Sequence, residues 1–445
     1  MSGLLARVGY GALFVVVVPA LLVALGGVPV PFPTPRLPGV GWALTVTGAA
    51  IMVFGLGTLM VRGRGLPMNA FPPERLVTTG VFGLVPHPIY TGFCLATGGL
   101  ALALGSPGGL WVSTPTAVLG CLALAVGHER LSLLERFGEL PRPVLALRRN
   151  PPGWQALLAA TERLANSWSS VRLGPVRIMN HVVWSGLAGG VGAAGAVLAA
   201  GARYAAPVAL LMVAGAVGAM VMGQLLVGSS QRLSRPFGYF GSLAAIAVLG
   251  GAWVLASPQD AVLLAAFALV APWTQAVGRL RCLVQGCCHG APAASGIVVT
   301  NPHSRACAHA GLSGVAIHPT QLYSILGNLV LGSVLLAAWL AHAPLTLVMG
   351  GYLVGAGTVR FIEEAYRGEP LTRIVAGLRI YQWFAVAMFV VGALVMLVPS
   401  APAPAPDLAA WPAAAALGVL FFVVCGAAMS VDLPDSRAPL SRLSG

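Results

Sequence analysis

The sequence predicts an all-α polytopic membrane protein with about twelve transmembrane helices in two fused helical domains. Hydrophobic residues make up 57% of the 445 residues and charged residues only 8%, and the mean hydropathy is +0.86. A water-soluble domain of this composition would expose a very large apolar surface, so the solvent must be lipid. A helix needs about 20 apolar residues to cross a hydrocarbon core of about 30 Å. The candidate spans are 10–30, 39–61, 88–104, 108–127, 180–202, 207–227, 239–256, 261–277, 319–341, 344–359, 380–399 and 409–430.

The basic residues, all of them arginine, indicate how the chain crosses the membrane. The net charge is +13, but the arginines are scattered between apolar segments and do not gather on a soluble face, which argues against a nucleic-acid partner. Alternating the spans from the N-terminus puts all the arginines except Arg36 and Arg203 on one side. The positive-inside rule makes that side cytoplasmic. We therefore expect a multi-pass protein of a bacterial-type inner (plasma) membrane with both termini in the cytoplasm.

The most polar stretch of the chain separates two apolar blocks. It runs from His128 to Arg177 and contains eight arginines and a proline-rich run. The predicted organisation is a membrane domain of four spans at 1–150, a basic amphipathic linker at 151–177, a membrane domain of seven spans at 178–400, and an extra span with a tail at 401–445.

Two segments outside the predicted spans have patterns of their own. In the linker, apolar residues between Trp154 and Trp168 recur at near-helical spacing. This spacing predicts either a helix in the membrane interface or a cytoplasmic helix packed against the protein. The tail after Val431, which contains Pro434, Ser436 and Pro439, is predicted to be disordered.

Polar residues stand at both ends of a short hairpin in the first block. Pro86–Gly92 (PHPIYTG) begins one span, and residues 128–139 (HERLSLLERFGE) follow the next. A hairpin returns both ends to one membrane face, so His87, Tyr90 and Glu129 are expected to converge there. Histidine can bond a carboxylate or shuttle a proton, and Gly92 lets a ligand or a neighbouring helix approach the backbone.

These two segments resemble the membrane methyltransferases typified by isoprenylcysteine carboxyl methyltransferase and phosphatidylethanolamine N-methyltransferase. In that family a His-Pro-x-Tyr-x-Gly element and a Glu-rich segment ending in Phe-Gly-Glu enclose S-adenosylmethionine. The resemblance covers about residues 40–140 and implies that this cofactor is bound by His87, Tyr90, Gly92, Glu129 and Glu135. The alternative is that His87 and Glu129 only cap helix ends.

Three separated segments carry the polar chemistry of the second block: Gly278–Gly290 (GRLRCLVQGCCHG), His318–Tyr323 (HPTQLY) and Arg360–Arg367 (RFIEEAYR). All three fall on the arginine-rich side. Arginine at a helix end in a membrane is costly without an anionic partner and by default marks a functional site. Within the third segment, residues 360, 364 and 367 share one helical face, where Glu364 can hold both guanidinium groups toward a phosphate.

The chemistry of these groups suits a lipid phosphodiester. A guanidinium is planar and permanently charged, and it matches the geometry of a phosphate. His318 is a candidate for proton transfer at a nucleophile or leaving group.

In this order, the three segments resemble prolipoprotein diacylglyceryl transferase, over about residues 170–399. That family moves a diacylglyceryl group from phosphatidylglycerol to a cysteine thiol and releases glycerol phosphate. The resemblance implies contact of Arg279 and Arg360 with the lipid phosphate, and the phospholipid-binding residues are then Arg279, Gln321, Tyr323, Arg360, Glu364 and Arg367. The catalytic candidates are His318, Arg279, Arg360 and Tyr239.

Three segments depart from the pattern of that family. A His or Tyr precedes Gly-Gly in the family, whereas this chain reads YFGS at 239–242, so the general base is missing unless Tyr239 or His318 substitutes for it. The usual Asn and Glu of the Gly-Arg element are replaced by Cys282, Gln285 and the Cys287-Cys288 pair, and the Glu expected after Gln-Leu-Tyr is Ser324.

Cysteines and histidines also gather in the second block, as a zinc site would require. Adjacent Cys287 and Cys288 seldom both ligate one ion, and no C-x-x-C spacing occurs, so we expect no metal there. Reactive thiols or packing positions are the alternatives for these cysteines.

The hypothesis that these patterns favour is a bifunctional lipid-modifying enzyme. It combines S-adenosylmethionine-dependent methyl transfer with transfer of a glyceryl group from a membrane phospholipid such as phosphatidylglycerol to an unknown acceptor. The second hypothesis is a non-catalytic lipid-binding scaffold that has lost the catalytic base, and Phe240 and Ser324 are its support. A transporter is the third, because Gly-interrupted helix pairs occur in transporters.

Overall fold

Long apolar helices make up most of the computed structural model, which describes residues 16–65, 73–141, 144, 152–227, 237–369, 373–438 and 441–443. The chain divides into two units, one of residues 1–151 with 389–399 and one of residues 152–388 with 400–445. The predicted fold class, an all-α polytopic membrane protein, is confirmed. Apolar side chains on the long helices, such as Leu255, Val330 and Val423, are more than half exposed, as a lipid-facing surface requires.

Nine helical stretches of the described residues are long and apolar enough to cross a membrane: Pro38–Gly63, Gly109–Phe137, Val182–Ala200, Ala202–Leu225, Tyr239–Ala256, Pro258–Gln285, Thr320–Leu340, Leu345–Ala365 and Leu408–Ser430. Two shorter apolar helices, Pro88–Leu104 and Ile380–Met396, coincide with two further predicted spans. The remaining prediction, 10–30, begins outside the described residues, and its described part contains a nine-residue helix, Val18–Gly26.

The first unit is built from helices and three π-helical turns. The turns, Leu59–Gly63, Gly109–Ser113 and Ala125–Glu129, each continue into or out of an α-helix. The α-helices are α2 (Val18–Gly26), α3 (Pro38–Thr58), α4 (Val81–Leu84), α5 (Pro88–Leu104), α6 (Thr114–Leu124) and α7 (Arg130–Phe137).

Glycines bring the backbones of α3 and α5 into contact. A β-carbon at Gly48 would lie 2.5 Å from the carbonyl oxygen of Gly92, and one at Gly92 would lie 2.4 Å from the carbonyl oxygen of Gly48. One at Gly41 would lie 2.7 Å from the carbonyl oxygen of Gly99. Small residues allow such close approach in membranes, where van der Waals packing drives helix association. We refer to these contacts as the glycine seam.

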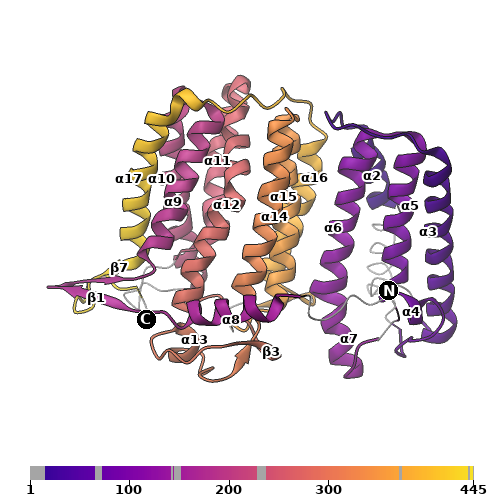
Figure 1. The fold of residues 1–445 in the computed structure, drawn as a ribbon, viewed down its shortest axis with the longest axis horizontal. Helices are drawn as coiled ribbons and strands as arrows, with labels where there is room; N and C mark the ends of the chain where they lie inside the picture. Colours follow the sequence, from indigo (N-terminus) through magenta and orange to yellow (C-terminus); the bar gives the residue numbers. More distant parts are fainter. Residues whose placement is uncertain are drawn as a thin grey trace. The chain divides into compact units, whose positions relative to one another are not determined.

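Seven of the long apolar stretches of the described residues lie in the second unit. Their helices stand side by side, and α8 lies across one end of the bundle (Figure 1). A buried core that includes Leu263, Trp339 and Val348 holds these helices together. The helices are α8 (Trp154–Ala165), α9 (Val182–Ala200), α10 (Ala205–Val227), α11 (Tyr239–Ala256), α12 (Ala261–Gln285), α13 (Arg305–Ala308), α14 (Thr320–Leu340), α15 (Leu345–Ala365), α16 (Ile380–Met396, which crosses the boundary between units) and α17 (Trp411–Ser430).

Short antiparallel strands connect some of these helices. They form three small sheets with the orders β1-β2-β7, β3-β4 and β5-β6. The strands are β1 (Ser170–Leu173), β2 (Val176–Met179), β3 (Pro292–Val298), β4 (Ala316–Ile317), β5 (Ile374–Val375), β6 (Leu378–Arg379) and β7 (Val431–Asp432).

Two of the predicted spans were too short at their C-terminal ends. The spans predicted to end at residues 277 and 359 continue as α12 to Gln285 and as α15 to Ala365. Arg279, Arg360 and Glu364 therefore lie inside the last turns of long helices. Hydropathy alone misses these turns because charged residues end an apolar window, even where partners from other helices neutralise them.

The segments outside the spans are packed. In the linker, α8 buries Leu158 and Ala165 in a cluster with Ile297 and Ile317. Of the two alternatives for this segment, these contacts support the helix that packs against the protein. The prediction of a disordered tail is wrong for its described residues. Asp432 accepts two hydrogen bonds from Arg177 at 2.9 and 2.7 Å and one from the Leu443 amide, whereas Pro439 lies outside the described residues.

The glycine seam yields a prediction. Gly48→Ala should destabilise the first unit, because its methyl group has only backbone and Leu95 to meet within about 3 Å. Gly57→Ala in the same helix is the matched control, since nothing lies within 4 Å of its β-carbon. It should be neutral or slightly stabilising. Thermal unfolding in detergent micelles measures both, and equal midpoints would contradict the seam.

Candidate functional site

Backbone hydrogen bonds join the three polar segments of the second unit at one end of α12, α14 and α15. The amide of Ala291 donates to the carbonyl of Tyr366 at 2.9 Å, and the amide of His318 donates to the carbonyl of Ala291 at 3.0 Å. The amide of Gly368 donates to the carbonyl of His289 at 3.0 Å. Segments that are far apart in the sequence thus form one continuous structure, which positions their charged side chains.

Glu363 lies between Arg279 and Arg360. Arg279 on α12 donates to one carboxylate oxygen of Glu363 at 2.7 Å, and Arg360 on α15 donates to the other at 3.1 Å. Arg279 also donates through Nε to the Ser324 hydroxyl on α14 at 3.0 Å. Two guanidinium groups from different helices therefore meet at one carboxylate.

The ionic contacts continue along α15 and into the segment after it. Glu364 accepts from Arg360 at 2.7 Å and from Arg367 at 3.3 Å, in agreement with their i, i+4 and i+7 spacing. Arg367 also pairs with Glu369 at 2.5 Å. We call these six residues the arginine–glutamate chain: Arg279, Glu363, Arg360, Glu364, Arg367 and Glu369.

The arginine–glutamate chain is balanced in charge, and its members on α15 and Arg367 are buried. Glu363 and Glu364 are 1% exposed. Burial alone would lower the pKa of Arg367, but attraction to Cys288 and to Glu369, Glu363 and Glu364 raises that pKa well above the usual arginine value. The guanidinium groups are therefore held charged and oriented.

Among the described residues, some polar atoms of the arginine–glutamate chain have no hydrogen-bond partner. They are Nε of Arg360, Nε of Arg367 and Oε1 of Glu364, each buried. An unsatisfied buried polar atom is costly, by about 1–3 kcal/mol for a typical group. Two donors and one acceptor are thus available to a ligand that brings both an anionic oxygen and a hydrogen-bond donor.

The predicted catalytic residue Tyr239 is held inside the helix bundle. Its hydroxyl lies 2.7 Å from that of Tyr352, and Gln275 donates to the hydroxyl of Tyr352 at 3.0 Å. The ring centroid of the neighbouring Phe240 lies 5.8 Å from the Arg360 guanidinium carbon. The ring of Tyr381 lies nearer to the same carbon, at 5.0 Å, so two aromatic rings flank this guanidinium group.

The HPTQLY segment places His318 among aromatic rings, and its Gln321 holds the loop after α12. His318 Nδ1 lies 3.2 Å from the Tyr323 hydroxyl, and its ring packs edge-on against Tyr366. Gln321 is 2% exposed and donates to the carbonyl of Cys287 at 2.8 Å, so it supports the loop after α12.

Sequence reasoning missed three residues of this site. Glu363 and Glu369 complete the arginine–glutamate chain, and Ser324 accepts from Arg279 where a glutamate was expected. The EE pair at 363–364 was a signal for Glu363, because adjacent carboxylates on a helix point in different directions and reach different partners.

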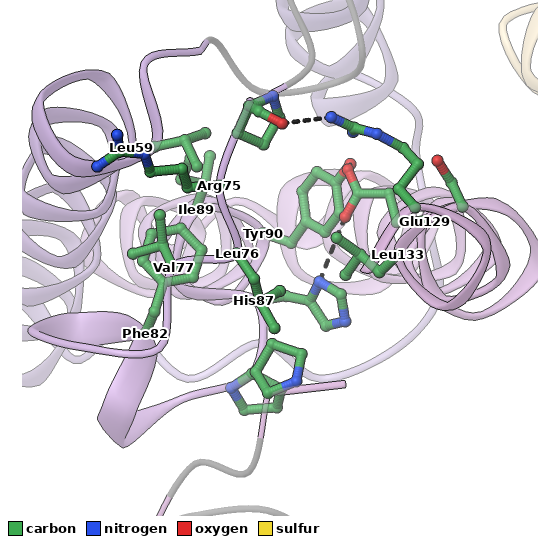
Figure 2. A pocket seen from close by; sticks show the side chains of 15 residues that line it. Leu59, Arg75, Leu76, Val77, Phe82, His87, Ile89, Tyr90, Glu129 and Leu133 are labelled. Atoms are coloured by element: carbon green, nitrogen blue, oxygen red, sulfur yellow. Dashed lines mark hydrogen bonds and ion pairs between the residues drawn. The ribbon is translucent and has the colours of Figure 1, made fainter. Parts of the chain in front are cut away.

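In the first unit, His87, Tyr90 and Glu129 converge as predicted. Tyr90 donates to Glu129 at 2.5 Å, and His87 Nδ1 lies 3.3 Å from the other oxygen of Glu129. These side chains line a pocket together with Leu59, Arg75, Val77, Phe82 and Arg136, and Figure 2 shows the carboxylate of Glu129 between the two rings. Glu129 ends the π-helical turn Ala125–Glu129, and such turns often occur at functional sites.

The other candidate cofactor residues lie apart from the pocket lining. Gly92 faces Gly48 in the glycine seam, so the close approach that we anticipated is made by a neighbouring helix. Glu135 is exposed on α7 and does not line the pocket. His87 occupies the N-cap position of α5 without a side-chain capping bond, and Glu129 likewise caps nothing. The helix-capping alternative therefore finds no support.

The fold and the site define a multi-pass membrane protein with a buried arginine–glutamate chain at one end of its second helical unit. Residues 234–398, which include all six residues of the arginine–glutamate chain, match the family described as "Prolipoprotein diacylglyceryl transferase". One relative, the phosphatidylglycerol–prolipoprotein diacylglyceryl transferase 2 of Clostridium perfringens, is 31% identical over 96 residues, 22% of this chain and 36% of the relative. The corresponding transferase of Clostridium tetani is 32% identical over 98 residues, 22% of this chain and 37% of the relative.

The match is confined to part of each protein. The chain spans about a third of the length of the curated relatives that it matches. The family match begins at residue 234, so the first 233 residues lie outside it.

The shared role of Glu363 yields a prediction. Glu363→Ala leaves Arg279 without its carboxylate partner and should lower the free energy of unfolding by about 3–5 kcal/mol. Arg172→Ala is the control, because it removes an ion pair with Asp435 in which both side chains are more than half exposed and should cost about 1 kcal/mol or less. Thermal unfolding in micelles compares the two, and equal losses would contradict the central position of Glu363.

Proposed function

We propose that the second unit is a transferase that takes a diacylglyceryl group from an anionic phospholipid such as phosphatidylglycerol. The observation that carries the proposal is the meeting of Arg279 and Arg360, from two helices, at Glu363. The match of residues 234–398 to the diacylglyceryl transferase family supports it, as does the similarity to two phosphatidylglycerol-dependent transferases.

The geometry suits stabilisation of a leaving phosphate. Transfer breaks the bond between the diacylglyceryl carbon and a phosphate oxygen, and glycerol phosphate departs with additional negative charge. Guanidinium groups that are fixed before the reaction stabilise this charge without reorganisation. Glu363 and Glu364 fix Arg360 in this way, and Nε of Arg360 and of Arg367 remain available as donors.

The non-catalytic scaffold is the alternative for this unit. Its support is Phe240, which stands where the family has a His or Tyr and lies beside Arg360. His318, next to Tyr323 and Tyr366, is the candidate that keeps proton transfer possible. Turnover separates the two, because a scaffold releases no glycerol phosphate.

For the first unit we propose S-adenosylmethionine binding and methyl transfer, which would make the protein bifunctional. The specific observation in favour is the pocket that His87, Tyr90 and Glu129 line. A carboxylate held by two rings is a hydrogen-bond acceptor for ribose hydroxyl or amino groups.

The transferase proposal predicts the behaviour of Arg360→Ala in phosphatidylglycerol bilayers. Release of labelled glycerol phosphate should fall by about 10²–10³-fold, the usual effect of removing one fixed donor to a developing charge. Both carboxylates keep a partner in this variant, Glu363 with Arg279 and Glu364 with Arg367, so we expect it to fold. Arg172→Ala should retain full release, since Arg172 lies on the exposed β1 strand.

An absence of glycerol phosphate release by the unaltered protein in these bilayers would remove the transferase proposal and leave the scaffold as the account of the second unit. Undiminished release by a folded Arg360→Ala variant would instead remove Arg360 from the site that stabilises the leaving phosphate.

The methyltransferase proposal predicts that the unaltered protein binds S-adenosylmethionine and that Glu129→Gln binds it about 10–100-fold more weakly. That range follows from about 1.5–3 kcal/mol for a hydrogen bond to a charged group. Glu135→Gln is the matched control, because Glu135 lies outside the pocket lining and should bind as well as the unaltered protein. Equilibrium dialysis with labelled cofactor measures all three, and equal affinities in both variants would count against this site.

A further inference from the structure

Three thiols converge at the end of α12. The sulfur atoms of Cys282, Cys287 and Cys288 all lie within 4.8 Å of one another. Among the described residues, no other His, Cys, Asp or Glu joins this group at that distance. Cys287 is buried, and Cys282 and Cys288 are partly exposed, so the group, which we call the thiol cluster, is accessible in part.

The backbone explains how adjacent cysteines reach the same place. Gly286 ends α12 in the left-handed conformation with φ of +73°, and Cys288 is also left-handed with φ of +60°. These two reversals bring the chain back over the last turn of α12, where Cys282 lies. A cysteine in this conformation costs about 1–3 kcal/mol, and such strain concentrates at functional sites.

Neighbouring segments hold the thiol cluster in a fixed frame. Gln321 donates to the carbonyl of Cys287 at 2.8 Å, and Thr320 donates to that of Cys288 at 2.7 Å. The amide of Cys288 donates to Glu369 at 2.7 Å. Because these backbone groups of Cys287 and Cys288 are hydrogen-bonded to neighbouring segments, both cysteines are held in place before any ligand arrives.

Three thiols in this arrangement suit a zinc ion. Zinc binds thiolate sulfur at about 2.3 Å in a tetrahedron, which sets sulfur–sulfur distances of roughly 3.8 Å. The observed limit of 4.8 Å is within reach of a small rotation of the side chains. Three protein ligands leave the fourth position open, as in catalytic and not structural zinc sites.

The charges around the thiol cluster favour the zinc-bound form of the three cysteines. Three thiolates and Zn²⁺ together carry one negative charge, which arginines nearby can offset. Arg281, 7% exposed, directly precedes Cys282, and Arg279 lies one helical turn before it. Arg367 pairs with Glu369, the same carboxylate that accepts from the Cys288 amide. A hydrogen bond from the Cys288 amide to Glu369 therefore joins the thiol cluster to the arginine–glutamate chain.

We propose that Cys282, Cys287 and Cys288 bind one zinc ion whose open position takes the acceptor thiol for diacylglyceryl transfer. The zinc site follows from the geometry of the cysteines, whereas the role of the acceptor thiol rests on the proposed transferase function. The family resemblance already implies a cysteine thiol as this acceptor, and the thiol cluster is a place where it can be bound.

The reaction balances with zinc as the activating group. The acceptor thiol loses its proton to solvent on binding the metal, since a ligand to zinc must be a thiolate. Its sulfur forms a bond to the diacylglyceryl carbon as the bond from that carbon to the phosphate oxygen breaks. Glycerol phosphate leaves with the bonding electron pair beside Arg279 and Arg360. No protein base is required, which accounts for Phe240 where the family has a His or Tyr.

Metal analysis of the full chain, purified under reducing conditions in lipid nanodiscs, tests the zinc site. We expect one zinc ion per chain after incubation with zinc salt and dialysis. Each of Cys282→Ser, Cys287→Ser and Cys288→Ser should reduce this occupancy severely. Cys307→Ser is the matched control, because its thiol bonds the carbonyl of Val299 away from the thiol cluster and should leave the zinc content unchanged.

Cobalt substitution tests the number of thiolates and the open position. Co²⁺ bound by three thiolates gives sulfur-to-metal charge-transfer absorption, which should fall by about a third for each cysteine replaced. A cysteine-containing peptide added to the cobalt protein should raise that absorption, whereas the same peptide with serine should not.

Each outcome decides part of the proposal. No stoichiometric metal, or a disulfide within the thiol cluster under these conditions, would overturn the zinc site. A metal that does not respond to the thiol peptide would overturn the acceptor role. Zinc and peptide binding without glycerol phosphate release would instead refute the transferase function and leave a thiol-binding zinc site.

Discussion

The structure of the second unit depends on one buried carboxylate, that of Glu363. Removing charges from water is expensive in a membrane-embedded bundle, and the attraction between buried partners offsets this cost only when the geometry is good. Glu363 meets that condition for Arg279 and Arg360 at once. The polar ends of α12 and α15 can therefore lie against each other, and the HPTQLY segment and the loop after α12 are built around this pairing.

Local spacing predicted the interactions within one helix, and it could not predict those between helices. The i, i+4 and i+7 positions of Arg360, Glu364 and Arg367 indicated their contacts, because a helix fixes those distances. The contact of Arg279 with Glu363 depends on how α12 and α15 pack, and no sequence period encodes that. The lengths of the two helices were underestimated for the same reason, since the charges that appeared to end them are neutralised from elsewhere.

Backbone conformation brings the cysteines together in a way that their spacing did not predict. The left-handed residues Gly286 and Cys288 turn the chain back, and the sulfur atoms of Cys282, Cys287 and Cys288 lie within 4.8 Å of one another. Glycine adopts this conformation readily, whereas that of Cys288 is not evident from residue type. In the first unit, by contrast, a hairpin was enough to predict that His87, Tyr90 and Glu129 meet. These residues lie at the two open ends of the hairpin that α5 and α6 form.

Backbone contact between α3 and α5 restricts how the first unit can move. Two helices that touch through glycine backbones cannot slide past each other by exchanging side-chain rotamers. Tyr90 lies on α5 and His87 at its N-terminus. A ligand that widens the pocket therefore displaces the other lining segments, such as the π-helical turn that carries Glu129.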